Sequence, residues 1–191
     1  MKPEHDMYHG HNGRIWSGNP NDALMKYATD VVGNTALDIG AGEGADSAWL
    51  LTHDFAVTAV EPSPIAAAVL REQAPTAHVL QTTFEQAELA TYDLVTAFYT
   101  PLLDTATTVT KLLEAVARGG TLLVVHHDDI SKMAAHFGRS IDEFLLPPVL
   151  AKHLEQRDDF EILANEQSSR EVTTGQGAAY RIDLVLKAKR T

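Results

Sequence analysis

The feature that most constrains this chain is a glycine-rich turn between a short apolar run and a helix. The turn spans residues 40–44, Gly-Ala-Gly-Glu-Gly, and follows Thr35–Ile39, which has the length and composition of a buried parallel strand. Gly40 permits a tight turn, Gly42 lets a ligand press against the backbone, and Gly44 lets the helix start close to the strand. This order of elements is typical of nucleotide-binding α/β folds.

Strand-like and helix-like segments alternate around this turn. We expect strands at 35–39, 55–60, 77–80, 92–98 and 121–125, and helices at 21–31, 45–51, 64–73 and 103–116. Two further strand-like runs, 160–172 and 179–188, are joined by a turn around 174–177. Repeated strand–helix pairs with short connections predict a doubly wound, Rossmann-like α/β sheet that is mostly parallel, and the final runs predict a C-terminal antiparallel hairpin.

The length of 191 residues fits a single domain. We divide residues 1–191 into an N-terminal arm and helix (1–33), a cofactor-binding core (34–126), an insertion (127–158) and the terminal hairpin (159–191). Because long connections beyond the carboxyl end of a strand often cover a ligand, we expect the insertion to cover the substrate.

Charge and composition exclude several classes of partner. The formal net charge is −11 and no Lys/Arg run forms a basic patch, so DNA and structured RNA are poor substrates for this chain. There are no cysteines, which excludes disulfides and thiolate chemistry. The N-terminus lacks an apolar signal region, and no apolar stretch reaches the ~18 residues that a membrane span needs. We therefore expect a cytoplasmic protein without a membrane partner.

Two carboxylates flank the glycine turn. Asp38 lies in the strand just before Gly40, where it would repel a pyrophosphate and suit a cationic group such as an ammonium. Glu61 ends the second strand, about 20 residues beyond Gly40, a spacing that brings a carboxylate beside the first turn to accept ribose hydroxyls. Structural roles remain open, a turn or helix cap for Asp38 and a solvated strand end for Glu61. Ala45 also completes a dinucleotide pattern, so an NAD-binding oxidoreductase is an alternative.

These residues carry a resemblance to a known family. Residues 38–44 (Asp-x-Gly-x-Gly-x-Gly) and 60–62 (Val-Glu-Pro) resemble motifs I and II of the class I S-adenosylmethionine-dependent methyltransferases. Residues 92–95 (Tyr-Asp-Leu-Val) resemble the family's fourth-strand motif, and residues 118–120 (Arg-Gly-Gly) resemble its fifth. The motifs follow one another in the expected order over residues 35–126.

A further likeness, at residues 16–21 (Trp-Ser-Gly-x-Pro-Asn), is to a small bacterial subgroup that includes tellurite-resistance-type (TehB-like) methyltransferases. The resemblance implies a seven-stranded sheet that the C-terminal hairpin completes. It also implies S-adenosyl-L-methionine as cofactor and in-line methyl transfer to a small-molecule acceptor: a metabolite, a xenobiotic or a metalloid oxyanion.

The resemblance also implies which residues bind the cofactor. The glycine turn would line its methionine part with help from Asp38, Glu61 would bind the ribose, and Pro62 would flank the adenine. The family often has an acidic residue beside the adenine amine; here we place Thr83 and Phe84 there instead. The expected cofactor-binding residues are Asp38, Gly40, Ala41, Gly42, Gly44, Glu61, Pro62, Thr83, Phe84, Ala97 and Phe98.

Candidates for substrate handling follow strands four and five. His126 is the preferred general base, needed only if the acceptor is protonated, and Tyr99 is the second candidate catalytic residue. Packing roles remain open for both, as a loop histidine and a packed aromatic ring. The sequence Phe-Tyr-Thr-Pro at 98–101 replaces the Asn/Asp-Pro-Pro-Tyr/Phe pattern of enzymes that methylate nucleobase or glutamine amino groups, which argues against those substrates.

The N-terminus holds a histidine cluster, His5, His9 and His11, near Asp6. We expect no metal site there, because free termini rarely organise one. An arm that folds over the cofactor, anchored by Tyr8 and Trp16, is our preferred interpretation.

The main alternative function is a non-catalytic S-adenosylmethionine-binding module, such as a sensor. Measured methyl transfer would exclude it, and a response to NADH but not to S-adenosylhomocysteine would favour the dehydrogenase alternative. The residues that choose the acceptor, 1–20 and 127–158, carry no pattern that identifies it, and the sequence predicts no oligomeric state.

Overall fold

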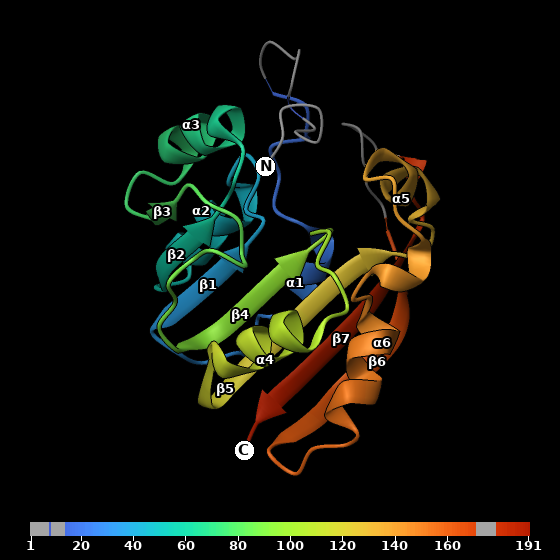
Figure 1. Ribbon diagram of the computed structural model, residues 1–191. Coiled ribbons are helices and arrows are strands. Elements are labelled where there is room, and N and C mark those ends of the chain that lie inside the picture. Colours follow the sequence, from blue (N-terminus) through green and yellow to red (C-terminus); the bar gives the residue numbers. More distant parts are fainter. Residues whose placement is uncertain (1–7, 9–13, 171–178) are drawn as a thin grey trace.

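The structure, a computed structural model, describes Tyr8 and residues 14–170 and 179–191 (Figure 1). The strands are β1 (Thr35–Ile39), β2 (Ala56–Val60), β3 (His78–Leu80), β4 (Tyr92–Phe98), β5 (Val116–His127), β6 (Phe160–Ser169) and β7 (Ile182–Arg190). The helices are α1 (Asp22–Tyr27), α2 (Ala45–Thr52), α3 (Pro64–Gln73), α4 (Ala106–Glu114), α5 (Ser131–His136), the 3-10 turn η2 (Ile141–Glu143) and α6 (Pro147–Leu154).

The strands form one 7-stranded sheet in the order β3-β2-β1-β4-β5-β7-β6. The pairs from β3 to β5 are parallel, whereas β7 is antiparallel to both β5 and β6. The prediction of a doubly wound, Rossmann-like sheet with a C-terminal antiparallel hairpin is confirmed.

Helices cover both faces of the sheet because the strand side chains alternate in direction. On one face, Leu37 and Ile39 of β1 share an apolar cluster with residues of α4 and α6. On the other face, Ala36 of β1 shares a cluster with residues of α1 and α2. Figure 1 shows α4 and α6 in front of the sheet and α1 behind it. Strands buried on both faces explain the near-continuous apolar runs in the sequence.

Two predicted helices are longer than the observed ones. The helix expected at 103–116 is limited to α4 because Leu103 instead pairs with Phe144 in an isolated β-bridge and Val116 already belongs to β5. The helix expected at 21–31 ends at Tyr27. In both cases the apolar spacing continues into residues that pack in other backbone conformations, which periodicity alone does not distinguish.

The final strand carries buried polar side chains. The polar and apolar residues of β7 alternate as in a half-exposed strand, but β7 lies between β5 and β6, and its Asp183 and Lys187 are buried. Lys187 Nζ donates to Asp30 at 2.6 Å. The turn expected around 174–177 and the cluster of His5, Asp6, His9 and His11 lie outside the described residues.

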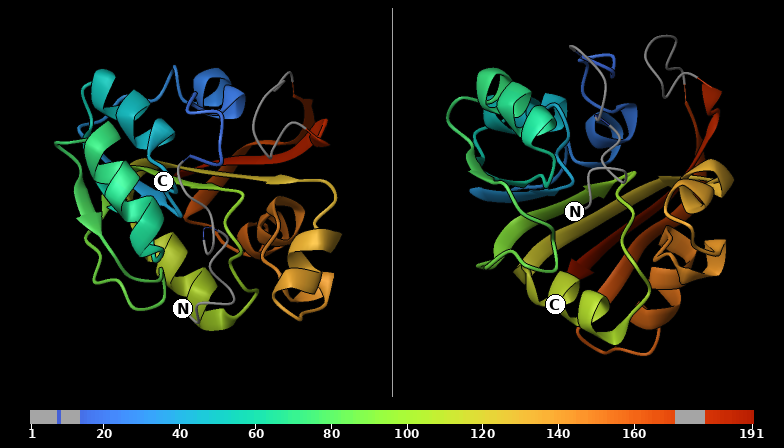
Figure 2. Two further views of the ribbon diagram at one scale, coloured as in Figure 1. Left: turned by 90° about the horizontal axis from the view of Figure 1, so that it is seen from above. Right: turned by 45° about the horizontal axis from the view of Figure 1, so that its top comes forward.

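Several segments gather beyond the carboxyl ends of the parallel strands. The stretch from Arg14 to Asn21 runs past these ends before α1, and α5 lies beyond the end of β5 (Figures 1 and 2). Among the residues described, no helix combines the length and apolar character needed to cross a membrane.

Candidate active site

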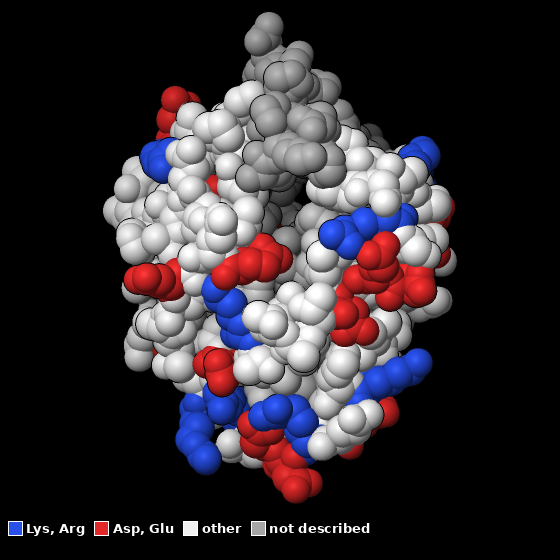
Figure 3. Space-filling view, in the orientation of Figure 1, with Lys and Arg blue, Asp and Glu red and all other residues white. Residues whose placement is uncertain are grey.

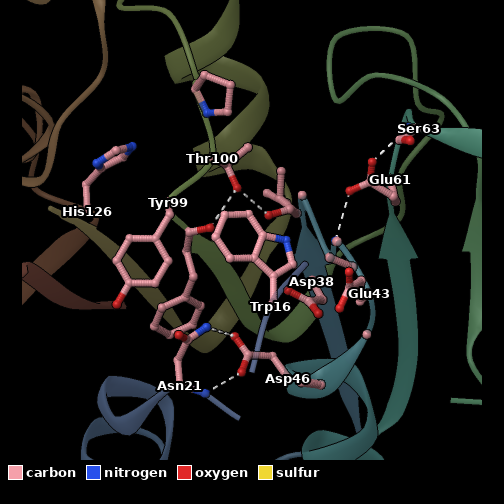
Figure 4. A pocket seen from close by; sticks show the side chains of 18 of the residues that line it. Trp16, Asn21, Asp38, Glu43, Asp46, Glu61, Ser63, Tyr99, Thr100 and His126 are labelled. Atoms are coloured by element: carbon pink, nitrogen blue, oxygen red, sulfur yellow. Dashed lines mark hydrogen bonds between the residues drawn. The ribbon is translucent and has the colours of Figure 1, made fainter. Parts of the chain in front are cut away.

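The main cavity of the described structure has a volume of about 610 Å³. Its walls come from the carboxyl ends of β1, β2, β4 and β5, from the stretch before α1, and from α5. Figure 4 shows Glu61 and Ser63 on one side of it and His126 on the other. In parallel α/β sheets, ligands bind at this end of the strands.

The backbone of the glycine turn lines the cavity. Its glycines have positive φ angles, which cost other residues conformational free energy. Gly40 has φ +72°, and a Cβ there would lie 2.3 Å from Thr100 Oγ1. Its N–H donates to Val60 O at 2.8 Å, which fixes the turn to the end of β2. At Gly42, with φ +55°, a Cβ would lie 2.9 Å from the Tyr8 hydroxyl. The absence of side chains leaves a cradle of bare backbone.

Glu61 is buried and bridges the turn and the start of α3. Its Oε2 accepts the Gly42 N–H at 2.8 Å, and its Oε1 accepts the Ser63 N–H at 2.7 Å. Each carboxylate oxygen has two lone pairs, so these bonds orient the group and leave acceptor capacity for hydroxyls.

Asp38 and Asp46 place two further carboxylates beside the turn. Asp38 accepts hydrogen bonds from Ser47 Oγ at 2.6 Å and from Thr96 Oγ1 at 3.2 Å. Asp46, in the first turn of α2, accepts both the backbone N–H and the side-chain amide of Asn21, each at 2.7 Å. The second pair of bonds attaches the N-terminal stretch to the cavity wall.

Burial and neighbouring carboxylates raise the pKa of Asp38. Burial raises the pKa of Asp38 to about 7, and the charges of Asp46 and Glu61 act in the same direction, against the hydrogen bonds from Ser47 and Thr96. Burial also raises the pKa of Asp46. A cation at this place would favour the ionised form of both groups.

Glu43 is a fourth buried acid of the cavity. Its Oε1 accepts the Ile15 N–H at 2.6 Å, while its Oε2 has no hydrogen-bond partner among the described residues and lies 3.8 Å from Arg14 Nε. Together with Asp38, Asp46 and Glu61, Glu43 makes the part of the cavity around the glycine turn acidic. This set of acidic hydrogen-bond acceptors fits a cationic nucleoside with hydroxyls and would repel a pyrophosphate.

All the predicted site residues but one line this cavity. Ala97 lies in the hydrophobic core, on the face of the sheet that α4 and α6 cover. Gly44 is the N-cap of α2 and also packs against α3, since a Cβ there would lie 2.4 Å from Leu70 Cδ1. The cavity-lining residues from the prediction are Asp38, Gly40, Ala41, Gly42, Gly44, Glu61, Pro62, Thr83, Phe84, Phe98, Tyr99 and His126.

His126 lies near the end of β5 and is 5% exposed. Neither of its ring nitrogens has a hydrogen-bond partner among the described residues. Burial, with the neighbouring His127, lowers its pKa to about 4, so the ring is neutral at pH 7. A neutral imidazole offers one donor and one acceptor to a ligand.

Tyr99 has the strained φ of +54° and is held from several sides. Its hydroxyl donates to Asp183 Oδ2 at 2.8 Å, and its ring stacks on His127 with centroids 4.2 Å apart. The Arg170 guanidinium lies over the same ring, 4.8 Å from its centroid. Burial and the charge of Asp183 hold its pKa well above the usual range, so the phenol stays protonated.

Tyr8 and Trp16 lie over the glycine turn. Trp16 Nε1 donates to the Tyr8 hydroxyl at 2.6 Å, and both residues line the cavity. This position is compatible with the predicted arm over the cofactor, for which the described part of the arm supplies two aromatic side chains.

Several residues of the site were not assigned from the sequence. They are Asn21, Asp46, Ser47, Thr96, Thr100, Arg170 and Asp183. Asn21 was the expected start of a helix but received no role in the site, and Asp183 was placed only in an expected strand. Apart from Ser47, which bonds to Asp38 nine residues earlier, they have partners far away in the sequence, and periodicity carries no information on such pairs.

The surface in Figure 3 has Lys/Arg and Asp/Glu side chains interspersed, without a broad basic area on that face. Among the residues with described positions, no group of at least 3 His, Cys, Asp or Glu side chains forms a candidate metal site.

Comparison with known proteins assigns the glycine turn to a recognised domain. A protein-family model described as "Methyltransferase domain" matches residues 36–120. No curated protein matches the sequence.

Solved structures extend the likeness in fold. The N-methyltransferase NodS from Bradyrhizobium japonicum WM9, in complex with S-adenosyl-l-homocysteine, has 16% identity and a TM-score of 0.69 over 94% of this chain and 93% of that chain. Magnesium protoporphyrin IX methyltransferase (ChlM) from Synechocystis PCC 6803, with bound SAM, has 15% identity and a TM-score of 0.62 over 88% and 76%. A structure on the conversion of a disulfide bond into a thioacetal group during echinomycin biosynthesis has 19% identity and a TM-score of 0.67 over 99% and 88%.

At these identities the structures establish a shared fold. The match to the methyltransferase-domain model covers residues 36–120, the part of that fold that contains the glycine turn.

Proposed function

We propose that this protein transfers the methyl group of S-adenosylmethionine to a small molecule by in-line displacement. The observation that carries the proposal is the group of buried carboxylates around the glycine turn, Asp38, Glu43, Asp46 and Glu61. A sulfonium nucleoside with an ammonium group is matched by this charge. The pyrophosphate of NAD would be repelled, so the dehydrogenase alternative is not favoured.

Each part of the cofactor has candidate partners in the cavity. Glu61 accepts ribose hydroxyls, Asp38 favours the ammonium of the methionine part, and bare backbone at Gly40, Ala41 and Gly42 lets that part approach closely. Pro62, Thr83 and Phe84 are proposed to surround the adenine. The positions of these residues along one wall support the assignment.

The bound cofactor supplies an electrophilic methyl group, so the protein's task is to position the acceptor and exclude water. Proximity and orientation can contribute ~7–11 kcal/mol to lowering such a barrier. His126 is proposed to hold the acceptor and take its proton where one is lost. Tyr99, whose hydroxyl is bound to Asp183, is proposed to act through its ring as a wall of the acceptor space.

The acceptor is proposed to be a small molecule rather than a nucleic acid, in keeping with the net charge of −11 and the mixed surface charge. A cytoplasmic location remains a proposal from the sequence. The likeness to tellurite-resistance-type methyltransferases rests on residues 16–21 alone and stays a hypothesis about the chain's relatives.

Calorimetric titration tests the cofactor assignment. S-adenosylmethionine and S-adenosylhomocysteine should bind to the wild-type protein and bind less tightly to Asp38→Ala and Glu61→Ala, and NADH should give no heat of binding. Unchanged affinity in both variants would refute the site. Methyl transfer to thiol, hydroxyl or metalloid acceptors would then separate an enzyme from a binding module.

A further inference from the structure

The cavity has two chemically different halves. One half holds the four buried carboxylates around the glycine turn. The other half, beyond the ends of β4 and β5, is lined by apolar side chains and rings, among them Leu102, Ile130, Met133 and Phe137. We call this second half the acceptor chamber. Figure 4 shows Tyr99 and His126 on this side, away from Glu61.

The two buried charges described at the border of the acceptor chamber pair with each other. Arg170 and Asp183 are both buried, and Arg170 Nε lies 3.5 Å from Asp183 Oδ2. Asp183 also accepts the Tyr99 hydroxyl and lies 3.2 Å from His127 Nδ1, so its charge is balanced within the protein. Asp129, at the rim, is exposed, and its carboxylate accepts the Ser131 N–H at 2.9 Å. An anionic or cationic acceptor would lose hydration here, and the described residues offer it no buried counter-charge that is not already paired.

Among the described residues of this half, His126 is a buried polar group without a hydrogen-bond partner. His126 is 5% exposed, and its Nδ1 and Nε2 make no hydrogen bond to any described residue. Tyr99 and His127 meet its ring edge-on, with centroids 6.1 and 5.9 Å away, and neither hydroxyl nor ring nitrogen satisfies it. Because an unpaired buried polar group costs free energy, a ligand that bonds to this ring gains more than the same bond is worth in water.

On this basis, and resting on the proposed methyltransferase function, we propose that the acceptor is an uncharged, largely apolar molecule whose hydroxyl or thiol hydrogen-bonds to His126. The apolar lining takes the body of the molecule, and the neutral ring takes its one polar hydrogen. Metalloid oxyanions, carboxylates and ammonium compounds are the wrong substrates for this chamber.

The methyl-transfer step balances with the groups present. A lone pair of the acceptor oxygen or sulfur forms the new bond to the methyl carbon, and the cofactor sulfur keeps the electron pair of the broken bond. The acceptor's hydrogen passes as a proton to the accepting nitrogen of His126. Since burial disfavours the charged ring, the equilibrium favours return of that proton from the imidazolium to solvent.

A matched set of benzyl compounds tests the chamber without relying on turnover. Benzyl alcohol, benzyl mercaptan, benzyl methyl ether, benzylamine and phenylacetate are titrated into the intact protein saturated with S-adenosylhomocysteine. Binding constants come from ligand-observed NMR, and the ring ¹⁵N shifts of His126 report a hydrogen bond. His126→Phe removes the bond, whereas His126→Gln keeps a donor and an acceptor; circular dichroism checks that both variants fold.

We expect the alcohol or the mercaptan to bind about two- to tenfold more tightly than the ether, with a shift of the His126 resonances. That preference should vanish in His126→Phe and persist in His126→Gln, and the two charged probes should bind least. Even if the variants fail to fold, equal binding of ether and alcohol to the wild type, or tighter binding of a charged probe, overturns the inference.

The two proposals fail in different ways. If S-adenosylhomocysteine does not bind, the proposed function is wrong. If it binds and the benzyl series shows no preference for hydroxyl or thiol, the cofactor assignment stands and the acceptor class is wrong.

Discussion

Glu61 Oε2 accepts a hydrogen bond from the Gly42 N–H at 2.8 Å, so the end of β2 is attached to the middle of the glycine turn. The same carboxylate accepts the Ser63 N–H through its other oxygen. The carboxylate of Glu61 is therefore oriented before a ligand binds, and binding costs no additional entropy to order the Glu61 side chain.

Replacing Glu61 by Gln should weaken binding of S-adenosylhomocysteine about 10- to 100-fold, since a hydrogen bond to a charged group contributes ~1.5–3 kcal/mol. Isothermal titration calorimetry measures the change. Glu72→Gln, in the exposed part of α3, is the matched control and should bind like the wild type. Equal losses in both variants would point to a general electrostatic effect instead.

Cofactor binding should depend on pH through Asp38. The pKa of Asp38 is raised by burial from 3.8 to about 7, and a cation bound beside it would lower that pKa again. Binding of S-adenosylhomocysteine should therefore release a proton near pH 6, and its affinity should rise as the pH increases from about 5 to 8. Calorimetry in buffers of different ionisation enthalpy measures the released protons. Asp38→Asn should abolish the release and the exposed Asp158→Asn should keep it.

The same shift predicts the pH dependence of the ligand-free protein's stability. Because the folded-state pKa of Asp38 lies above its unfolded value, its contribution to stability is full below pH 3.8 and is lost as the pH rises through about 7. Over that interval the free energy of unfolding should fall less steeply in Asp38→Asn than in the wild type. Urea titrations from pH 4 to 8 would reveal parallel curves if Asp38 were ionised throughout.

Gly40→Ala should destabilise the fold by more than its backbone angle explains. Positive φ costs a non-glycine residue ~1–2 kcal/mol, and the new Cβ would also meet Thr100 Oγ1 at 2.3 Å. Gly138 has a similar φ of +62° with nothing within 4 Å, so Gly138→Ala measures the backbone cost alone. Urea unfolding should show Gly40→Ala to be less stable than Gly138→Ala by ~1–3 kcal/mol. Equal stabilities would mean that Thr100 moves away freely.

Ligand binding should be visible through Trp16. The chain has 2 tryptophans. Trp16 lines the cavity, whereas Trp49 lies in α2 and stacks on His53, the residue that follows this helix. Adding S-adenosylhomocysteine should change the fluorescence of Trp49→Phe as it does that of the wild type, and should leave Trp16→Phe nearly unchanged. A signal that persists in Trp16→Phe would place the cofactor away from the N-terminal stretch.

The sequence was sufficient for the parts of this protein that depend on local pattern. The apolar runs of β1, β2 and β4 and the glycine turn predict the sheet and its binding edge, because buried parallel strands and positive-φ turns impose their composition directly. The location of Glu61 followed from its spacing to the turn.

The remaining features depend on which distant segments meet. Asn21 pairs with Asp46, and Arg170 pairs with Asp183. The local sequence around each of these residues does not predict which distant residue it will contact. Leu103 fits a helical stripe as well as the bridge that it makes to Phe144. Ala97 lies at the end of β4 beside the cavity-lining Phe98, but adjacent residues of a strand point to opposite faces of the sheet. Which of the two side chains reaches the cavity depends on how the strand packs in the folded protein.

The position of β7 has a consequence for how the two halves of the cavity come into being. In the described sheet, β6 pairs only with β7, and β7 pairs with β5 on its other side. β6 therefore joins the sheet only once β7, which follows it in the sequence, has inserted between β5 and β6. β1 and β2 pair residues 21 positions apart in the sequence, whereas β5 and β7 pair residues 56 to 68 positions apart and so close a longer loop. We therefore expect the ends of β1 and β2, with Asp38 and Glu61, to form before the part of the acceptor chamber that depends on Asp183 of β7.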